Sequence, residues 1–250
     1  MTALERFVRN WVLPFADPRR PASVARLPEF FRDFLRYRQR TSGEVVRLRE
    51  ASPCLLDRTA RTPFDPHYFY QGAWLARRLA DQRPAMHVDV GSSVLMISVL
   101  SGQVPILFVD YRPLNAGLPA VTAVAANITE LPFADGSIAS LSSLHVVEHV
   151  GLGRYGDPLN PEGSRQALRE LARVLAPGGR LYLSVPVGRE RVCFNAHRVI
   201  SPDKILGWAP GLYLEAFALV DDQGRFSEPA PLTAARSLEY GCGLFVLSRS

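Results

Sequence analysis

From residue 65 onward, short apolar runs alternate with segments whose apolar residues recur at helical spacing. Asp65-Pro66 joins a helix-capping acid to a proline suited to the first helical position, and predicts a helix to about residue 81. Residues 162–176 carry three leucines on one face, and Pro177-Gly178-Gly179 is expected to close that helix. Shorter helices are predicted at 94–100 and from residue 201 onward.

The apolar runs between these helices predict seven strands. They cover residues 85–91, 105–110, 121–127, 137–144, 180–186, 213–221 and 243–250. Because strands and helices alternate, we expect a mostly parallel sheet with right-handed crossovers and helices on both faces. The predicted fold class is α/β: a seven-stranded, mostly parallel, Rossmann-like sheet with an N-terminal helical extension.

The extension covers residues 1–62 and differs in character from the α/β domain predicted at 63–250. It is rich in arginine, and prolines interrupt its two predicted helices, near 4–13 and 24–38. Five apolar side chains share one face of the second helix: Leu27, Phe30, Phe31, Phe34 and Leu35. Two interpretations stay open. The helices form a cap on the sheet domain, or they present a basic amphipathic surface for a weak contact with a membrane surface or a protein.

Positive charge is concentrated in the same region. Residues 1–50 hold 11 arginines against 6 acids, whereas residues 51–250 hold 18 basic and 18 acidic residues. A neutral sheet domain argues against binding nucleic acid, which needs a basic face. Cys54, Cys193 and Cys242 lie far apart, so neither a disulfide framework nor a thiolate metal site is predicted. With no recognisable secretory signal or membrane span, we expect a cytoplasmic protein.

Candidate chemistry gathers after the fourth predicted strand, at the edge where parallel α/β sheets bind ligands. His145, Glu148 and His149 follow that strand with the H-x-x-E-H spacing of one class of zinc protease. Zinc chemistry would need two histidines one helical turn apart and a third ligand downstream, whereas this segment continues a strand. No metal is therefore predicted.

Motifs around this edge resemble class I S-adenosylmethionine-dependent methyltransferases. LPFADGSI, the Glu-His pair after the fourth strand and RVLAPGGRLYLSVP match that family in order and spacing, and the resemblance runs from about residue 86 to 250. The family usually ends in a strand pair inserted antiparallel at the sheet edge, which fits the two C-terminal strands. The resemblance implies a methyltransferase-type sheet with S-adenosylmethionine as the cofactor.

The glycine loop after the first strand departs from the family pattern of acid-x-Gly-x-Gly-x-Gly. This chain reads Asp89-Val90-Gly91-Ser92-Ser93, followed by valine and leucine, and keeps only the first glycine. A serine held at positive φ costs about 1–2 kcal/mol. Ser93 is expected either to bear that strain or to avoid it and donate a hydroxyl hydrogen bond.

The resemblance assigns the cofactor to residues at the ends of the first three strands: Asp89, Gly91, Ser92, Ser93, Asp110, Tyr111, Asn127 and Ile128. Asp110 is expected to accept both ribose hydroxyls, since a carboxylate offers two oxygens. Tyr111 is placed near the adenine. Asn127-Ile128 stand where the family usually has an acid that contacts the adenine amino group.

His145, Glu148 and His149 are the candidate catalytic residues. Methyl transfer depends mostly on positioning, but a hydroxyl acceptor also benefits from a base, and histidine titrates near neutrality. The alternative, that these histidines only hold the loop by hydrogen bonds, stays open. Loops after the fourth and fifth strands supply the candidate acceptor contacts: Arg154, Tyr155, Arg191, Asn195 and His197.

HVDVGSSVLMISVL, FVDYRPL, EHVGLGRYGDP and FNAHR also resemble a little-characterised methyltransferase-like family whose bacterial members often accompany surface-polysaccharide synthesis. The sequence thus predicts an S-adenosylmethionine-dependent methyltransferase acting on a small-molecule or saccharide acceptor. The alternative is a catalytically degenerate module that uses the fold, and its basic N-terminal helices, to bind a partner or a membrane-associated complex.

Overall fold

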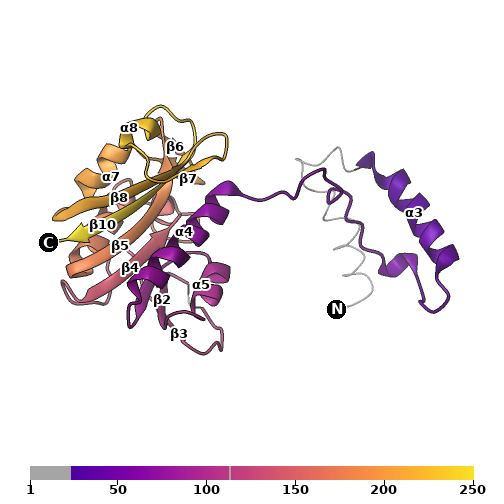
Figure 1. The fold of residues 1–250 in the computed structure, drawn as a ribbon, viewed down its shortest axis with the longest axis horizontal. Coiled ribbons are helices and arrows are strands. Elements are labelled where there is room, and N and C mark those ends of the chain that lie inside the picture. Colours follow the sequence, from indigo (N-terminus) through magenta and orange to yellow (C-terminus); the bar gives the residue numbers. More distant parts are fainter. Residues whose placement is uncertain (1–23, 113) are drawn as a thin grey trace. The chain divides into compact units, whose positions relative to one another are not determined.

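The computed structural model describes residues 24–112 and 114–250, and the chain divides into two compact units, Met1–Phe64 and Asp65–Ser250 (Figure 1). In the first unit, α3 (Leu27–Arg40) corresponds to the helix expected at 24–38, and η3 (Leu48–Glu50) is a single 3₁₀ turn. The helix expected near 4–13 lies outside the described residues.

Opposite charges hold the segment that follows η3 against α3. The Arg58 guanidinium pairs with Glu29 and lies 3.4 Å from an oxygen of Asp33, both on α3. Arg26, at the start of the helix, donates to the carbonyl of Leu55 over 3.3 Å. These pairs are exposed, so each contributes modestly to stability.

The second unit is built on one mixed sheet of eight strands. They are β1 (His87–Val90), β2 (Ile106–Asp110), β3 (Val121–Ala125), β4 (Ile138–Leu144), β5 (Leu175–Val187), β8 (Leu212–Val220), β9 (Phe226–Ser227) and β10 (Gly241–Arg249). Their order is β3-β2-β1-β4-β5-β10-β8-β9. Strands β1 to β5 pair in parallel, and β10 is antiparallel to both of its neighbours. The α/β prediction is confirmed.

Helices cover both faces of this sheet (Figure 1). Side chains along each strand point alternately to the two faces, so each face is apolar and forms a core with the helices that pack on it. On one face α4 (Pro66–Gln82) and α5 (Val94–Leu100) pack against Tyr182 and its neighbours. On the other face α6 (Gly163–Val174), α7 (Pro202–Trp208) and α8 (Leu232–Ala235) pack against Leu181 and Leu183. Asp65 caps α4 as predicted, accepting from the His67 amide over 2.9 Å.

The prediction of seven strands is short by one, because the chain turns back after β8. Asp221 accepts from the backbone of Gln223 and of Arg225, each over 2.9 Å, and Gly224 takes φ +73°. This turn brings β9 antiparallel to β8. The polar segment after β5 adds a separate hairpin of β6 (Arg191–Cys193) and β7 (His197–Val199).

The prediction that Pro177-Gly178-Gly179 closes the preceding helix is wrong. Helix α6 ends at Val174, and Leu175 already pairs with Ile138 in the sheet. The Pro-Gly-Gly segment instead forms a bulge in β5, where the register passes from Leu175 opposite Ile138 to Arg180 opposite Ser140. Glycine suits the bulge because the chain there packs against its own backbone.

No helix in the described ranges is long and apolar enough to cross a membrane.

We expect Gly179→Ala to lower the free energy of unfolding by about 1–3 kcal/mol. A β-carbon at this position would lie 2.8 Å from the carbonyl oxygen of Ala176 and 3.0 Å from that of Ile138. Gly207→Ala in α7 is the matched control, because a β-carbon there meets nothing within 4 Å, and it should gain about 0.5–1 kcal/mol. Urea unfolding measures both variants. Wild-type stability for Gly179→Ala would mean that the bulge has room for a side chain.

Candidate functional site

A pocket of about 680 Å³, a volume that includes the open solvent at its mouth, lies at the carboxyl ends of β1 to β4. The strand order reverses between β1 and β4, which is where open α/β sheets bind ligands. Eight of the predicted site residues line it: Gly91, Asp110, Tyr111, Asn127, Ile128, His145, His149 and Tyr155. Residues from four separate strand ends therefore meet at one cavity.

Gly91 lines the pocket with its backbone, because it has no side chain. It follows β1 at φ +75°, and a β-carbon on it would lie 2.9 Å from Cγ1 of Val146. Ser93 avoids the strain considered from the sequence, because it takes an extended conformation (φ −60°, ψ 122°) at the start of α5. Ser92 also lies outside the positive-φ residues. The loop therefore needs a glycine only at its first position.

Asp89 and Ser92, expected to contact a cofactor, are buried and do not line the pocket. The Ser92 hydroxyl donates to Asp89 over 2.8 Å and accepts from the backbone of Leu144 over 2.9 Å. Ser142 on β4 donates to the same carboxylate. These bonds tie the loop after β1 to the end of β4.

His87 continues this network away from the pocket. Its Nε2 lies 2.8 Å from the hydroxyl of Ser142, and its Nδ1 lies 2.7 Å from that of Ser140. Burial lowers the pKa of His87 to about 4, and burial raises the pKa of Asp89 to about 6 against the opposing effect of its serine donors. His87 and Asp89 thus belong to one buried hydrogen-bond network between β1 and β4.

Asp110 ends β2 with one oxygen engaged. Its Oδ1 accepts from the backbone of Arg112 over 2.7 Å, and the side chain is 17% exposed. That bond orients the carboxylate, and Oδ2 is left for a ligand in the pocket. Tyr111 beside it is exposed.

Asn127 and Ile128 form the wall after β3. The Asn127 side-chain oxygen accepts from the backbone of Thr129 over 3.0 Å, so its amide nitrogen remains as a donor. Ile128 is buried and gives the wall an apolar surface. The Asn127 oxygen is therefore less available to accept from a ligand than the family's acid would be.

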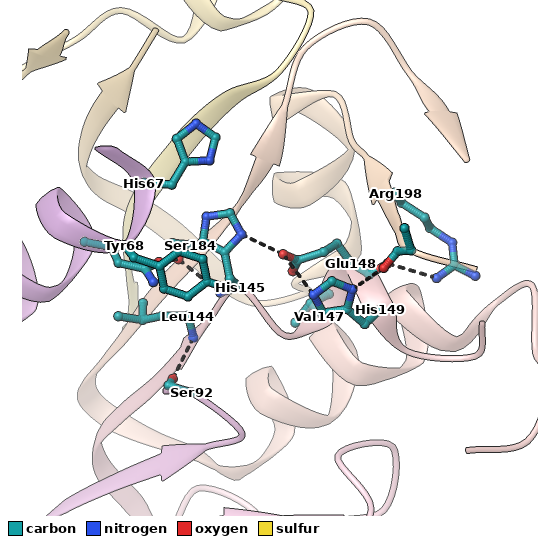
Figure 2. A network of polar contacts seen from close by, with 12 residues as sticks. His67, Tyr68, Ser92, Leu144, His145, Val147, Glu148, His149, Ser184 and Arg198 are labelled. Atoms are coloured by element: carbon teal, nitrogen blue, oxygen red, sulfur yellow. Dashed lines mark hydrogen bonds and ion pairs between the residues drawn. The ribbon is translucent and has the colours of Figure 1, made fainter. Parts of the chain in front are cut away.

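Glu148 lies between the rings of His145 and His149 (Figure 2). His145 donates from Nδ1 to the carboxylate over 2.7 Å, and Nε2 of His149 lies 3.7 Å from the same oxygen. The His145 backbone adopts φ +54° as β4 ends and donates to the carbonyl of Ser184 on β5 over 2.9 Å. The left-handed residue turns the chain into η4 (Val147–His149) and aims the ring inward.

The pKa values of His145 and His149 are shifted in opposite directions. Burial opposes a charge on His145, but the neighbouring Cys242 and Glu148 raise its pKa well above the usual value. Burial lowers the pKa of His149, partly offset by Glu148. His149 donates from Nδ1 to the carbonyl of Ala196 over 2.6 Å, in the turn of the β6–β7 hairpin.

Tyr155 covers the pocket on the loop that follows η4. Its ring is flanked by two guanidinium groups, that of Arg112 at 4.6 Å and that of Arg154 at 5.1 Å from the centroid. Asp157 holds this loop in place by accepting from the backbone of Gly151 over 2.7 Å. Tyr155 and Arg112 thus line the pocket, whereas Arg154 reaches it only through its contact with the Tyr155 ring.

The other expected acceptor contacts lie on the β6–β7 hairpin and do not line the pocket: Arg191, Asn195 and His197. Arg191 and Asn195 are exposed, and the His197 ring lies tilted against Tyr240 at 5.0 Å between ring centroids. Arg198 in the same hairpin is buried and donates to the carbonyl of Val150 over 2.6 Å, so it braces the loop.

Sequence reasoning missed a cluster beside His145. His67 in the first turn of α4 stacks on His145 at 5.4 Å, and Tyr68 stacks on the same ring at 5.5 Å (Figure 2). Cys242 on β10 joins them, completely buried. No spacing in the sequence links positions 67, 145 and 242. The available signal was only a histidine at a helix start and an isolated cysteine before an apolar strand.

Comparisons with known proteins support the architecture. Residues 124–211 match a family described as Caenorhabditis protein of unknown function, DUF268. No curated protein matches the chain. A candidate sarcosine dimethylglycine methyltransferase from Galdieria sulphuraria is 16% identical, with 72% of this chain and 86% of that chain covered and a TM-score of 0.53.

The N-methyltransferase NodS from Bradyrhizobium japonicum, solved with S-adenosyl-L-homocysteine, is 13% identical, with 74% of this chain and 88% of that chain covered and a TM-score of 0.50. At these identities the likeness establishes the fold alone. The chain has the Rossmann-like fold of class I methyltransferases.

The contributions of Asp89 and His87 to the free energy of unfolding are expected to change with pH in opposite directions. Between about pH 4 and 6, folded Asp89 holds a proton that the unfolded chain has lost, so its contribution to the unfolding free energy falls as pH rises. Folded His87 lacks a proton that the unfolded chain binds, so its contribution rises with pH. The two contributions nearly cancel in the wild-type protein.

Asp89→Asn should remove the falling contribution. Its free energy of unfolding should then rise with pH across this window more steeply than that of the wild type, by up to about 1.4 kcal/mol per pH unit. His87→Gln should change the slope in the opposite direction. Urea unfolding at several pH values measures these differences, and parallel curves for all three proteins would contradict the opposed titrations.

Proposed function

We propose that this protein transfers the methyl group of S-adenosylmethionine to a small-molecule or saccharide acceptor. The observation that carries the proposal is the pocket at the β1–β4 reversal, where Gly91, Asp110 and Asn127 meet. The fold that the chain shares with known methyltransferases supports the same reaction class.

The residues around the pocket fit this cofactor. Gly91 offers backbone without a side chain, so an amino-acid portion or ribose can approach closely. Asp110, already oriented by the Arg112 amide, has an oxygen for a ribose hydroxyl. Ile128 and Tyr111 offer apolar and aromatic surface for an adenine ring, with the Asn127 amide nitrogen beside them.

When bound, S-adenosylmethionine supplies an activated methyl group. The chain's part is to hold an acceptor in line with that methyl group and to exclude water. His145 and His149 line the pocket on the β4 side and are our candidates for contacts on the acceptor side, and the buried Glu148 carboxylate lies against both rings. Asp89 and Ser92 support the loop without contacting the cofactor.

Tyr155 and its two arginines favour an acceptor with a sugar ring or an anionic group. An aromatic ring offers a flat apolar face, and guanidinium groups form paired hydrogen bonds with carboxylates and phosphates. The resemblance to proteins that accompany polysaccharide synthesis points the same way. Nucleotide-activated sugars and sugar acids are therefore the first acceptors to screen with labelled cofactor.

We expect Asp110→Asn to weaken binding of S-adenosylhomocysteine about 10- to 100-fold. The substitution keeps the bond to the Arg112 amide but removes a charged acceptor, and charged hydrogen bonds contribute about 1.5–3 kcal/mol. Calorimetric titration of the full chain measures the affinity. Asp203→Asn is the control, because Asp203 lies on α7 and pairs with Arg236, and neither residue lines the pocket.

Unchanged affinity in Asp110→Asn would remove this residue from the cofactor site. Absence of heat with both S-adenosylmethionine and S-adenosylhomocysteine, in a wild-type protein that unfolds cooperatively, would sink the proposed reaction. The degenerate binding module would then be the better description of the chain.

A further inference from the structure

His67, His145 and Cys242 converge from three segments of the second unit. His67 lies in the first turn of α4, His145 follows β4, and Cys242 is near the start of β10. One nitrogen of each histidine and the cysteine sulfur all lie within 4.8 Å of one another. Zinc binds imidazole at about 2.0–2.1 Å and thiolate at about 2.3 Å. Inward movement of roughly an ångström would bring all three atoms to such an ion.

His145 has an unsatisfied atom in this cluster. Its side chain is 4% exposed, Nδ1 is engaged by Glu148, and Nε2 has no hydrogen-bond partner. A buried nitrogen without a partner costs about 1–3 kcal/mol. Because Nδ1 donates to Glu148, a metal ion would bind His145 through Nε2, in place of a proton on that nitrogen.

Glu148 has the position of a carboxylate that supports a metal-binding histidine. Metal-ligating histidines commonly donate their second ring nitrogen to a carboxylate, which sets the tautomer and strengthens the ligand. Glu148 is completely buried, and its 2.7 Å contact with Nδ1 holds the His145 ring against rotation. Its negative charge, together with a Cys242 thiolate, would balance a buried divalent cation.

The alternative use of these groups is a cysteine nucleophile activated by His145. That reaction needs a sulfur that a substrate can reach, and Cys242 is completely buried. A metal ion is small enough to bind a buried thiolate, and half-buried His67 leaves it a route to solvent. The burial pattern therefore favours an ion over covalent chemistry.

We propose that His67, His145 and Cys242 bind one divalent transition-metal ion of the zinc class, with Glu148 orienting His145 and a fourth coordination position left open. Two imidazoles and a thiolate suit zinc or cobalt and are poor ligands for magnesium or calcium. Three protein ligands leave room for water or a ligand atom. The site lies next to the pocket through His145 and is separate from the residues assigned to the cofactor.

The test is metal binding by the full chain after chelator treatment. Competition with a chromophoric chelator should give one zinc ion per protein. Cobalt substitution should give the visible bands of a tetrahedral ion and a charge-transfer band from the thiolate. Cys242→Ser should abolish that band, and Cys242→Ser and His67→Asn should each weaken zinc binding at least about 100-fold. Glu148→Gln should weaken it about 10- to 100-fold.

Matched controls separate the cluster from adventitious binding. Cys193→Ser changes a half-buried cysteine outside it, and His197→Asn changes a half-buried histidine whose ring, like that of His67, lies about 5 Å from the ring of Tyr240. Both controls should keep wild-type affinity. If Cys242→Ser fails to fold by circular dichroism, His67→Asn alone decides, since His67 is only half-buried.

No bound ion in folded wild-type protein, no thiolate band with cobalt, or equal losses in cluster and control variants would each overturn the proposal. Calorimetry with S-adenosylhomocysteine on the metal-free chain tests the cofactor pocket independently.

Discussion

Hydrogen bonds buried between β1 and β4 hold together the sheet edge at which the candidate pocket opens. Asp89 faces Ser142 in the register of the two strands, and the Asp89 carboxylate also accepts from the hydroxyl of Ser92. Ser92 in turn accepts from the Leu144 amide, one residue before His145. Leaving one of these groups unpaired away from water would cost about 1–3 kcal/mol, so the loop after β1 and the end of β4 move as one piece. Gly91 and His145, which line the same pocket, are thereby fixed relative to each other.

This network also explains the unusual glycine loop. A second and third glycine would allow the backbone more conformations, but here the chain leaves positive φ after Gly91 and enters α5 through extended Ser93. Ser92 uses its hydroxyl inside the protein, where a glycine would leave the Leu144 amide without this acceptor. The Ser92 side chain thus fixes the loop by hydrogen bonds, where the family's glycines would leave the backbone more conformations. The loss of family glycines is compatible with a cofactor pocket whose rigidity comes from β4.

Glu148 lies where two sites meet. One oxygen serves His145 and approaches His149, so a single buried carboxylate orients a ring on the pocket and a ring in the cluster with His67 and Cys242. Arg198 braces the same turn by donating to the carbonyl of Val150. The proposed methyl transfer and the proposed metal site would therefore share one rigid turn, and an ion at the metal site would affect the pocket through His145.

Much of the α/β unit was determined by the sequence itself. Apolar runs and caps located α4, α5, α7 and most strands, because these features depend on residues close together in the chain. The resemblance placed Gly91, Asp110 and Asn127 near one pocket, since the ends of parallel strands share an edge. Other outcomes depended on tertiary contacts. Pro177-Gly178-Gly179 became a bulge because Leu175 pairs with Ile138, and Asp89 turned inward because Ser142 lies opposite it. The cluster of His67, His145 and Cys242 was decided only by the tertiary structure, because α4, β4 and β10 meet through packing across the sheet and no local spacing records that contact.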